Sequence, residues 1–255
     1  MNFIDTHTHL YLEEFREDLG GVIEEAEKEG VTKFILPAID SQVIDPMIRL
    51  ETEYRGKCFA MMGLHPCSVK ENFQQELAIV RQWLELRPFV AIGEIGLDFY
   101  WDKTFTNQQY EAFEMQLSWA LEKQLPIVIH TRNAMQETID FVEPFAKKGG
   151  KGVFHCFSGS NSDAERITGL GFLLGIGGVL TYKNSGLANA ISKIDLESIV
   201  LETDAPYLAP VPYRGKRNKS SYIPLIAQKL AEVKGISLEE VALVTTRNAK
   251  KIFGI

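Results

Sequence analysis

Cysteine is scarce in this sequence, and no long hydrophobic run occurs. The 255 residues include three cysteines, and no two of them form a C-x-x-C pair. An odd number without close spacing argues against a disulfide-stapled secreted scaffold and is typical of reduced thiols in the cytosol. The longest uncharged stretch, 167–182, has 16 residues with five glycines, which is too short and too broken to span a membrane. Residues 1–5 show no basic and apolar leader. We therefore expect a cytoplasmic protein without membrane segments.

An excess of positive charge is also missing. The 34 acidic side chains outnumber the 27 basic ones and give a net charge of −7. A protein that coats nucleic acid with its whole surface would normally be basic. If phosphate is the partner, it must be held locally, by a metal or by a small basic patch. The 45% of apolar residues is ordinary for a globular chain and excludes a disordered tail protein.

Short apolar runs alternate with longer amphipathic segments along the whole chain. Continuous runs rich in Val, Ile, Leu and Phe are typical of strands that are buried on both faces of a parallel sheet. Between them, Tyr110, Phe113 and Leu117 recur at helical spacing. We expect strands at 2–6, 33–37, 58–64, 89–93, 126–129, 152–154, 172–176 and 199–202, and helices at 19–29, 105–124, 136–148, 222–234 and 238–253.

Eight strands alternating with helices predict an α/β fold, namely a (β/α)8 TIM-type barrel. We expect one such barrel over residues 1–255, with an extra C-terminal helix. An open, doubly wound sheet is the structural alternative. Its dinucleotide-binding fingerprint is missing, because Leu180 stands where the last glycine of G-x-G-x-x-G would be in the stretch 175–180.

All five histidines follow predicted strands, and the C-terminal ends of barrel strands carry the active site in this fold. His7 and His9 are two residues apart, so a strand would point both imidazoles to the same face. Converging imidazoles bind divalent metals well. His65, His130 and His155 end three further strands. We therefore expect a shared metal site rather than scattered core histidines.

Carboxylates follow two more strands. Glu94 lies in the apolar segment 91–98, where an unpaired charge would be costly, so it needs a metal or a basic side chain as its partner. Asp204 ends the eighth strand. It is either a helix N-cap or a metal ligand and the base that deprotonates a metal-bound water.

Three further acidic residues are candidates for supporting roles. Asp5 precedes His7 by two residues and either orients a histidine or is a buried structural aspartate. Glu202 precedes Asp204 by two residues and is placed to orient a histidine. For Asp98 we expect only a role in fixing the loop after the strand.

The candidate ligands comprise four imidazoles and two carboxylates, which is more than one catalytic zinc usually takes. They are His7, His9, His130, His155, Glu94 and Asp204. They fit two divalent ions that share a bridging carboxylate. Such a pair lowers the pKa of a bound water and stabilises both oxygens of an in-line displacement, so hydrolysis is the predicted reaction class. The ligand set leaves Zn, Mn, Mg, Ni and Fe open.

Substrate contacts are predicted from a basic run and from nearby aromatic side chains. The cations of 214–219 are either phosphate contacts or a solvated loop. His65 is a further candidate for a phosphate contact. Aromatic residues near the barrel mouth would stack on unpaired bases or are ordinary packing residues. The cations are Arg214, Lys216, Arg217 and Lys219, and the aromatics are Phe99, Tyr100, Trp101, Tyr207 and Tyr213.

Read in order, these motifs resemble the TatD family of metal-dependent hydrolases and deoxyribonucleases, within the amidohydrolase-like barrels. The ordered set spans nearly the whole chain. It comprises I-D-T-H-T-H-L at 4–10, G-L-H-P at 63–66, G-E-I-G-L-D at 93–98, I-H-T-R at 129–132, H-C-F-S-G at 155–159, E-T-D-A-P-Y at 202–207 and R-G-K-R-N at 214–218.

The resemblance implies two metal sites and a substrate. One ion would be held by His7, His9, Glu94 and Asp204, and the other by Glu94, His130 and His155, with Glu94 bridging. Arg132, His65 and the 214–219 run would position the strand. The family implies phosphodiester cleavage of DNA, often as a 3′–5′ exonuclease that prefers single strands, and some members are credited with acting on RNA or misacylated tRNA.

Two other functions remain open at this stage. The same barrel could hydrolyse an amide or ester of a small substrate, with the metals polarising a carbonyl. It could also bind metal or nucleic acid without turnover, although a complete ligand set argues against that. We expect no membrane contact, no obligate protein partner, and a monomer.

Overall fold

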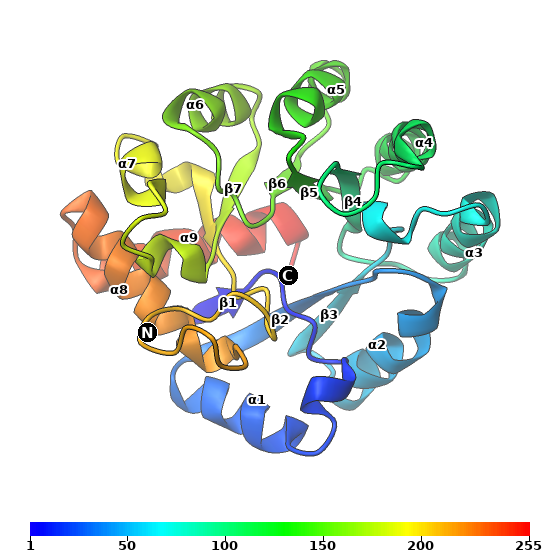
Figure 1. Ribbon diagram of the computed structural model, residues 1–255. Coiled ribbons are helices and arrows are strands. Elements are labelled where there is room, and N and C mark those ends of the chain that lie inside the picture. The colour runs from blue at the N-terminus through cyan, green and yellow to red at the C-terminus, as the bar shows by residue number, and fades with distance from the viewer.

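Eight parallel strands lie at the centre of the structure, a computed structural model that describes residues 1–255 (Figure 1). Strands β1 to β3 form one sheet and β4 to β8 form a second, each in chain order. The strands are β1 (Phe3–Asp5), β2 (Val31–Pro37), β3 (Cys58–Met61), β4 (Ile92–Asp98), β5 (Ile127–Arg132), β6 (Gly152–Phe154), β7 (Leu173–Ile176) and β8 (Ile199–Leu201).

Backbone hydrogen bonds join the two sheets at both of their edges. Between β3 and β4, the Gly93 amide donates to the Met62 carbonyl oxygen at 3.0 Å. Between β1 and β8, the His9 amide donates to the Ala205 carbonyl oxygen at 2.8 Å. Thr8 also forms a parallel bridge with Ala205. The α/β barrel that the alternating segments predicted is confirmed.

Most of the helices surround the strands as an outer ring, whereas α9 lies behind the strands in Figure 1. Local sequence explains where several begin. Ser160 and Asp163 form a reciprocal capping box at the start of α6, and the Ser237 hydroxyl accepts from the Glu240 amide at the start of α9. The helices are α1 (Leu19–Lys28), α2 (Ser41–Glu53), α3 (Phe73–Leu86), α4 (Thr106–Lys123), α5 (Met135–Lys147), α6 (Asn161–Gly169), α7 (Leu187–Ile191), α8 (Ile223–Lys234) and α9 (Leu238–Phe253). None combines the length and apolar character that crossing a bilayer requires.

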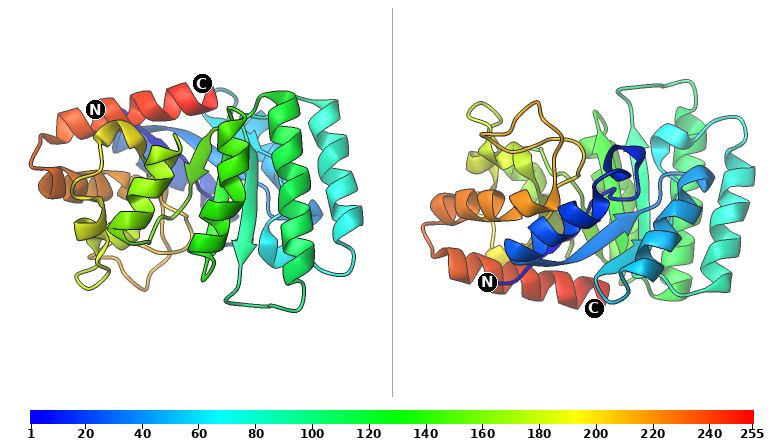
Figure 2. Two further views of the ribbon diagram at one scale, coloured as in Figure 1. Left: turned by 90° about the horizontal axis from the view of Figure 1, so that it is seen from above. Right: turned by 90° about the horizontal axis from the view of Figure 1, so that it is seen from below.

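The interior of the strand ring is apolar at one end only. Successive side chains of a strand point to opposite faces. Those on one face join a large outer cluster that packs against the helices, and those on the other face join a smaller cluster of nine buried residues. Ala249 and Phe253 of α9 belong to this smaller cluster, and Figure 2 shows α9 lying across one end of the barrel. The predicted C-terminal helix therefore closes the N-terminal end of the barrel. The other members are Ile4, Ile35, Met61, Ala91, Val128, Val153 and Val200.

The bounds predicted for the fourth strand, 89–93, are wrong. β4 runs from Ile92 to Asp98, so Glu94 lies inside the strand and not after it. A register shift against β5 occurs between Ile92 and Ile95, and an irregularity of this kind re-aims a side chain. In sequence, Gly93 and Gly96 read as strand breakers. In the barrel they permit close packing that the sequence pattern does not reveal.

Gly96 offers a test of that packing. Its φ is +143°, and a Cβ there would lie 2.0 Å from the His130 carbonyl oxygen. We expect Gly96→Ala to lower the free energy of unfolding by more than about 3 kcal/mol, through backbone strain and overlap with β5. Gly149→Ala is the matched control, because its φ is +89° and its Cβ would meet nothing within 4 Å. It should cost only about 1–2 kcal/mol. Equal urea denaturation midpoints for the two variants would contradict the close approach.

Candidate metal centre

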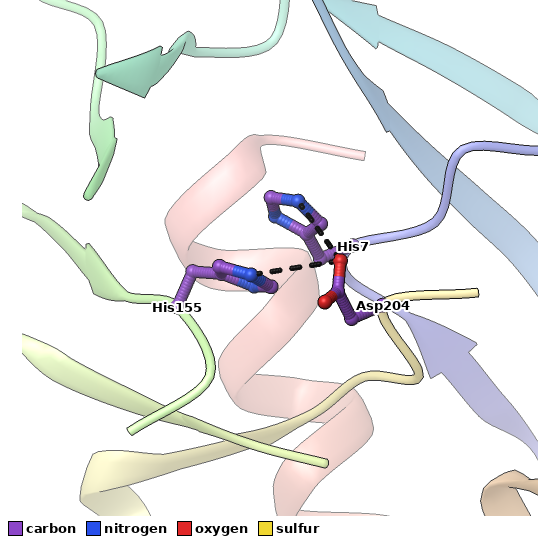
Figure 3. Close-up of side chains that lie close together, drawn as sticks. All are labelled: His7, His155 and Asp204. Carbon is purple, nitrogen blue, oxygen red and sulfur yellow. Dashed lines mark ion pairs between the residues drawn. The ribbon is translucent and has the colours of Figure 1, made fainter. Parts of the chain in front are cut away.

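Six side chains from five strands or strand ends meet at the end of the barrel opposite α9. His7 and His9 follow β1, Glu94 lies in β4 and His130 in β5, and His155 and Asp204 follow β6 and β8. Their nitrogen and oxygen atoms form overlapping groups of three within 4.8 Å: His7, His155 and Asp204 form one, and His7, His9 and Glu94 another. Figure 3 shows the His7 and His155 rings beside the Asp204 carboxylate. The structure therefore brings all six predicted ligands together.

His7 is the clearest sign that these side chains suit a metal. It is fully buried, and neither of its ring nitrogens has a hydrogen-bond partner. Its Nε2 lies 3.1 Å from Oε2 of Glu94 and 3.9 Å from Oδ1 of Asp204. Buried polar atoms are normally satisfied, so an orphaned nitrogen that faces two carboxylates fits a cation held among them.

Tyr11 sets the tautomer of His9. The Tyr11 hydroxyl donates to the Pro37 carbonyl oxygen, so its oxygen accepts from Nδ1 of His9 at 2.8 Å. A neutral imidazole that donates from Nδ1 has its lone pair on Nε2. That Nε2 lies 3.4 Å from Oδ1 of Asp204. His9 is thus held in the form that binds a metal. Tyr11 is not among the residues predicted for the site, because no motif or strand end includes it.

Glu202 approaches His155 from the corresponding side of its ring. Its Oε1 lies 2.9 Å from Nδ1 of His155 and also accepts from the Cys156 amide. Nε2 of His155 then faces Glu94 and Asp204 at 3.8 and 3.7 Å. A carboxylate behind a ligating imidazole fixes the ring and increases its basicity. Nδ1 of His155 is close to Glu202 without a well-formed hydrogen bond, so the role expected for Glu202, that of orienting a histidine, stays a prediction.

Asp98 has a larger role than its predicted one of fixing a loop. Its Oδ2 lies 2.9 Å from Nε2 of His130, while Nδ1 of His130 lies 3.0 Å from Oε1 of Glu94. His130 can therefore offer only Nδ1 to a metal. The signal was available in the sequence, since Glu94 and Asp98 are four residues apart and share one face of a strand. Because the predicted strand ends at residue 93, the sequence prediction does not place Glu94 and Asp98 on the same strand.

The charges of the centre depend on one another. Burial alone would raise the pKa of Glu94, but the imidazoles of His65, His7 and His155 outweigh it and hold that pKa well below its usual value. Burial alone would lower the pKa of His155, but the carboxylates of Glu202, Glu94 and Asp204 raise it to about 10. The carboxylates thus favour a positive charge at this position, which is also what a divalent cation supplies.

His65 forms a further group of possible metal ligands with Glu94 and His130, and its hydrogen bond favours the role of a donor. Its Nδ1 accepts from the Cys67 amide at 3.0 Å, so in the neutral ring Nε2 carries the proton. Burial lowers the pKa of His65, which favours this neutral form. Nε2 lies 3.5 Å from Oε1 of Glu94. A donor at the edge of the centre suits the phosphate contact expected of this residue.

Asp5 contacts hydroxyl and amide groups and no imidazole ring. Its Oδ2 accepts from the hydroxyls of Thr203 at 2.6 Å and Ser220 at 2.7 Å, and its Oδ1 accepts from the Thr203 amide at 2.9 Å. Burial raises the pKa of Asp5 to about 7, against the lowering effect of these donors. Of the two expected roles, these contacts match the structural one: Asp5 fastens β1 to the residue before Asp204.

The basic run divides into bound and available cations. Arg217 pairs with Asp18, its Nη1 lying 3.0 Å from Oδ1, and Lys219 pairs with Glu25 at 2.7 Å. Because its guanidinium is already paired with Asp18, the residue before α1, the expectation that Arg217 holds substrate phosphate is not supported by its contacts. Arg214 and Lys216 form no ion pair and lie over the rings of Tyr182 and Tyr213.

Comparison with known proteins identifies close relatives. The family model described as TatD related DNase matches residues 4–254. The metal-dependent hydrolase YabD of Bacillus subtilis is 36% identical over 252 residues, with 98% of each chain covered. A Pantoea ananatis protein named 3′-5′ ssDNA/RNA exonuclease TatD is 32% identical and covers 98% of this chain and 99% of its own. The crystal structure of YjjV, a TatD homologue from Escherichia coli, matches with a TM-score of 0.93 at 31% identity, covering 99% of this chain and 98% of that one.

Metal binding should depend on pH through His155. Because the pKa of His155 is about 10, a cation that binds its Nε2 near neutral pH must displace a proton. The apparent affinity for Zn²⁺ or Mn²⁺ should therefore rise by about tenfold per pH unit for each proton displaced, between pH 6 and 9. The number of protons displaced is measured as proton release into a weakly buffered solution when the metal is added. Glu202→Gln should reduce that number. An affinity independent of pH in this range would contradict the assignment.

Asp98 should affect metal affinity without touching the metal. Asp98→Asn removes the carboxylate behind Nε2 of His130, and we expect metal affinity to fall by about 10- to 100-fold. Asp102→Asn is the control, because Asp102 lies in the same loop and pairs with Lys70 at 2.9 Å, away from any histidine. Competition with a chromogenic chelator measures both. Equal affinities for the two variants would show that Asp98 only shapes the loop.

Proposed function

This chain belongs to the TatD-related DNase family of metal-dependent hydrolases, and from that membership we propose that it cleaves phosphodiester bonds of DNA, removing nucleotides from the 3′ ends of single strands. Membership confirms the resemblance that the ordered motifs indicated. The exonuclease activity named for the Pantoea ananatis relative supports the substrate proposed here. The metal-ligating groups of the barrel support a hydrolytic reaction.

The placement of Glu94 carries the proposal. Its carboxylate is buried, with Oε2 3.1 Å from Nε2 of His7 and Oε1 3.0 Å from Nδ1 of His130. The two oxygens of one carboxylate thus face histidines of two groups of possible ligands, His7 with His9 and His130 with His65, as a bridging ligand must. We propose two divalent ions, one held by His7, His9, Glu94 and Asp204 and the other by Glu94, His130 and His155.

When bound, such a pair would lower the pKa of a water and polarise the phosphoryl group. The protein's own residues then have separate tasks. Asp204 accepts the proton of the attacking water, since burial of its carboxylate is outweighed by His155 and His9, which lower its pKa and keep it ionised. The Nε2–H of His65 donates to a phosphate oxygen. Arg132, Arg214 and Lys216 attract the flanking phosphates.

A single-stranded DNA oligonucleotide labelled at its 5′ end tests the proposal. With chelator-stripped protein, we expect a ladder that shortens from the 3′ end only after a divalent metal is added, with Mg²⁺, Mn²⁺, Zn²⁺, Ni²⁺ and Fe²⁺ tried in turn. Glu94→Ala should abolish the ladder, because it removes the residue shared by both ions. Glu114→Ala, an exposed change in α4, is the control and should leave the ladder unchanged.

Two outcomes would overturn parts of the proposal. Full cleavage by metal-stripped Glu94→Ala would exclude Glu94 as the bridging ligand. An intact oligonucleotide under every metal condition, together with turnover of an amide or ester from a substrate panel, would assign the centre to carbonyl chemistry.

A further inference from the structure

Two exposed aromatic rings stand next to the metal centre without a packing partner in the core. Tyr100 and Trp101 lie in the loop between β4 and α4, and they are 51% and 67% exposed. Their ring centroids are 4.9 Å apart at an angle of 86°. Figure 2 shows that the loop between β4 and α4 protrudes at the end of the barrel opposite α9, which is the end that carries the metal centre. Adjacent large apolar rings left in water point to a ligand that covers them.

Arg132 joins this pair from the neighbouring strand. Its guanidinium carbon lies 3.8 Å from the ring centroid of Tyr100 and 5.2 Å from that of Trp101. No carboxylate pairs with Arg132, so its charge stays available. A guanidinium over aromatic faces supplies both a flat stacking surface and an attraction for phosphate. Apolar faces and unpaired positive charge together match a nucleotide better than an apolar peptide.

Asp98 connects these residues to the metal centre. Its Oδ1 accepts from the amides of Tyr100 at 2.9 Å and Trp101 at 3.1 Å, while its Oδ2 lies 2.9 Å from Nε2 of His130. The Gln109 side chain fixes Asp98 in turn, accepting from its amide and donating to its carbonyl oxygen. One carboxylate therefore sets the position of both aromatic residues relative to a proposed metal ligand.

We propose that Tyr100, Trp101 and Arg132 form a stacking platform for an unpaired nucleobase of the strand whose phosphodiester is cleaved at the metal centre. This inference rests on the proposed function and adds the part of the substrate that is recognised. A base in a duplex already stacks on its neighbours on both faces, whereas an unpaired base offers its face to aromatic side chains. Stacking does not depend on base identity, because every base has a π-face. The platform therefore selects unpaired ends rather than a sequence.

Removing the ring of Trp101 should lower activity only when the substrate carries a base that stacks on it. We expect Trp101→Ala to lower kcat/KM on a single-stranded oligonucleotide by about 5- to 150-fold. Trp101→Phe keeps an aromatic face and should retain most of the activity. The same variants are then assayed on oligonucleotides with an abasic residue placed at each position near the 3′ end in turn. At the stacked position, the loss caused by Trp101→Ala should disappear.

Three results would overturn the platform. They are full activity of Trp101→Ala, an equal loss on every abasic oligonucleotide, and an equal loss in Trp101→Phe. The last two would indicate a structural role for the loop.

A binding measurement separates this inference from the proposed function. Oligo(dT) added to metal-stripped protein should quench a component of the tryptophan fluorescence that Trp101→Leu lacks, while inorganic polyphosphate should not. Quenching without cleavage under any metal condition would contradict the nuclease proposal and leave base stacking at Trp101 supported. Cleavage without quenching, and without an effect of Trp101→Ala, would refute the platform and leave the nuclease proposal intact.

Discussion

The Glu94 carboxylate is buried inside the barrel with imidazoles on several sides, and the rest of the centre is arranged around it. An ionised carboxylate removed from water is costly unless cations or donors surround it. His7, His65 and His130 lie within 3.5 Å of its oxygens. Asp98 and then Glu94 raise the pKa of His130, and Glu202 and then Glu94 raise the pKa of His155, so the charge states within the cluster depend on one another.

A second group of residues determines which nitrogen each imidazole offers. Tyr11, Asp98 and Glu202 lie behind His9, His130 and His155, on the side of each ring away from the centre. Each contact leaves the opposite nitrogen facing the carboxylates. Carboxylates and hydroxyls behind metal-binding imidazoles orient the rings and tune their affinity for the metal. Because Asp98 also accepts hydrogen bonds from the amides of Tyr100 and Trp101, the orientation of His130 and the position of the proposed stacking platform depend on one side chain.

The two ends of the barrel differ in what fills them. At the N-terminal end, one layer of aliphatic side chains packs against Ala249 and Phe253 of α9. At the C-terminal end, the layer consists of imidazoles and carboxylates. Residues with strained backbones gather there, since Asn133, Cys156 and Asp204 have φ between +47° and +58° and follow β5, β6 and β8. The apolar layer supplies the rigidity that holds these residues in place.

The sequence alone predicted the barrel and the six candidate ligands that the structure brings together, because buried parallel strands leave continuous apolar runs and every candidate ligand stands in or beside one of them. Local signals such as the Ser237 cap were equally readable. The limits of β4 were not, because Gly93 and Gly96 resemble strand breakers until Val128 and the His130 backbone pack against them. Only the tertiary structure decided which nitrogen each histidine presents and that Arg217 pairs with Asp18. Those features depend on contacts between residues up to about two hundred positions apart in the chain, which no local pattern encodes.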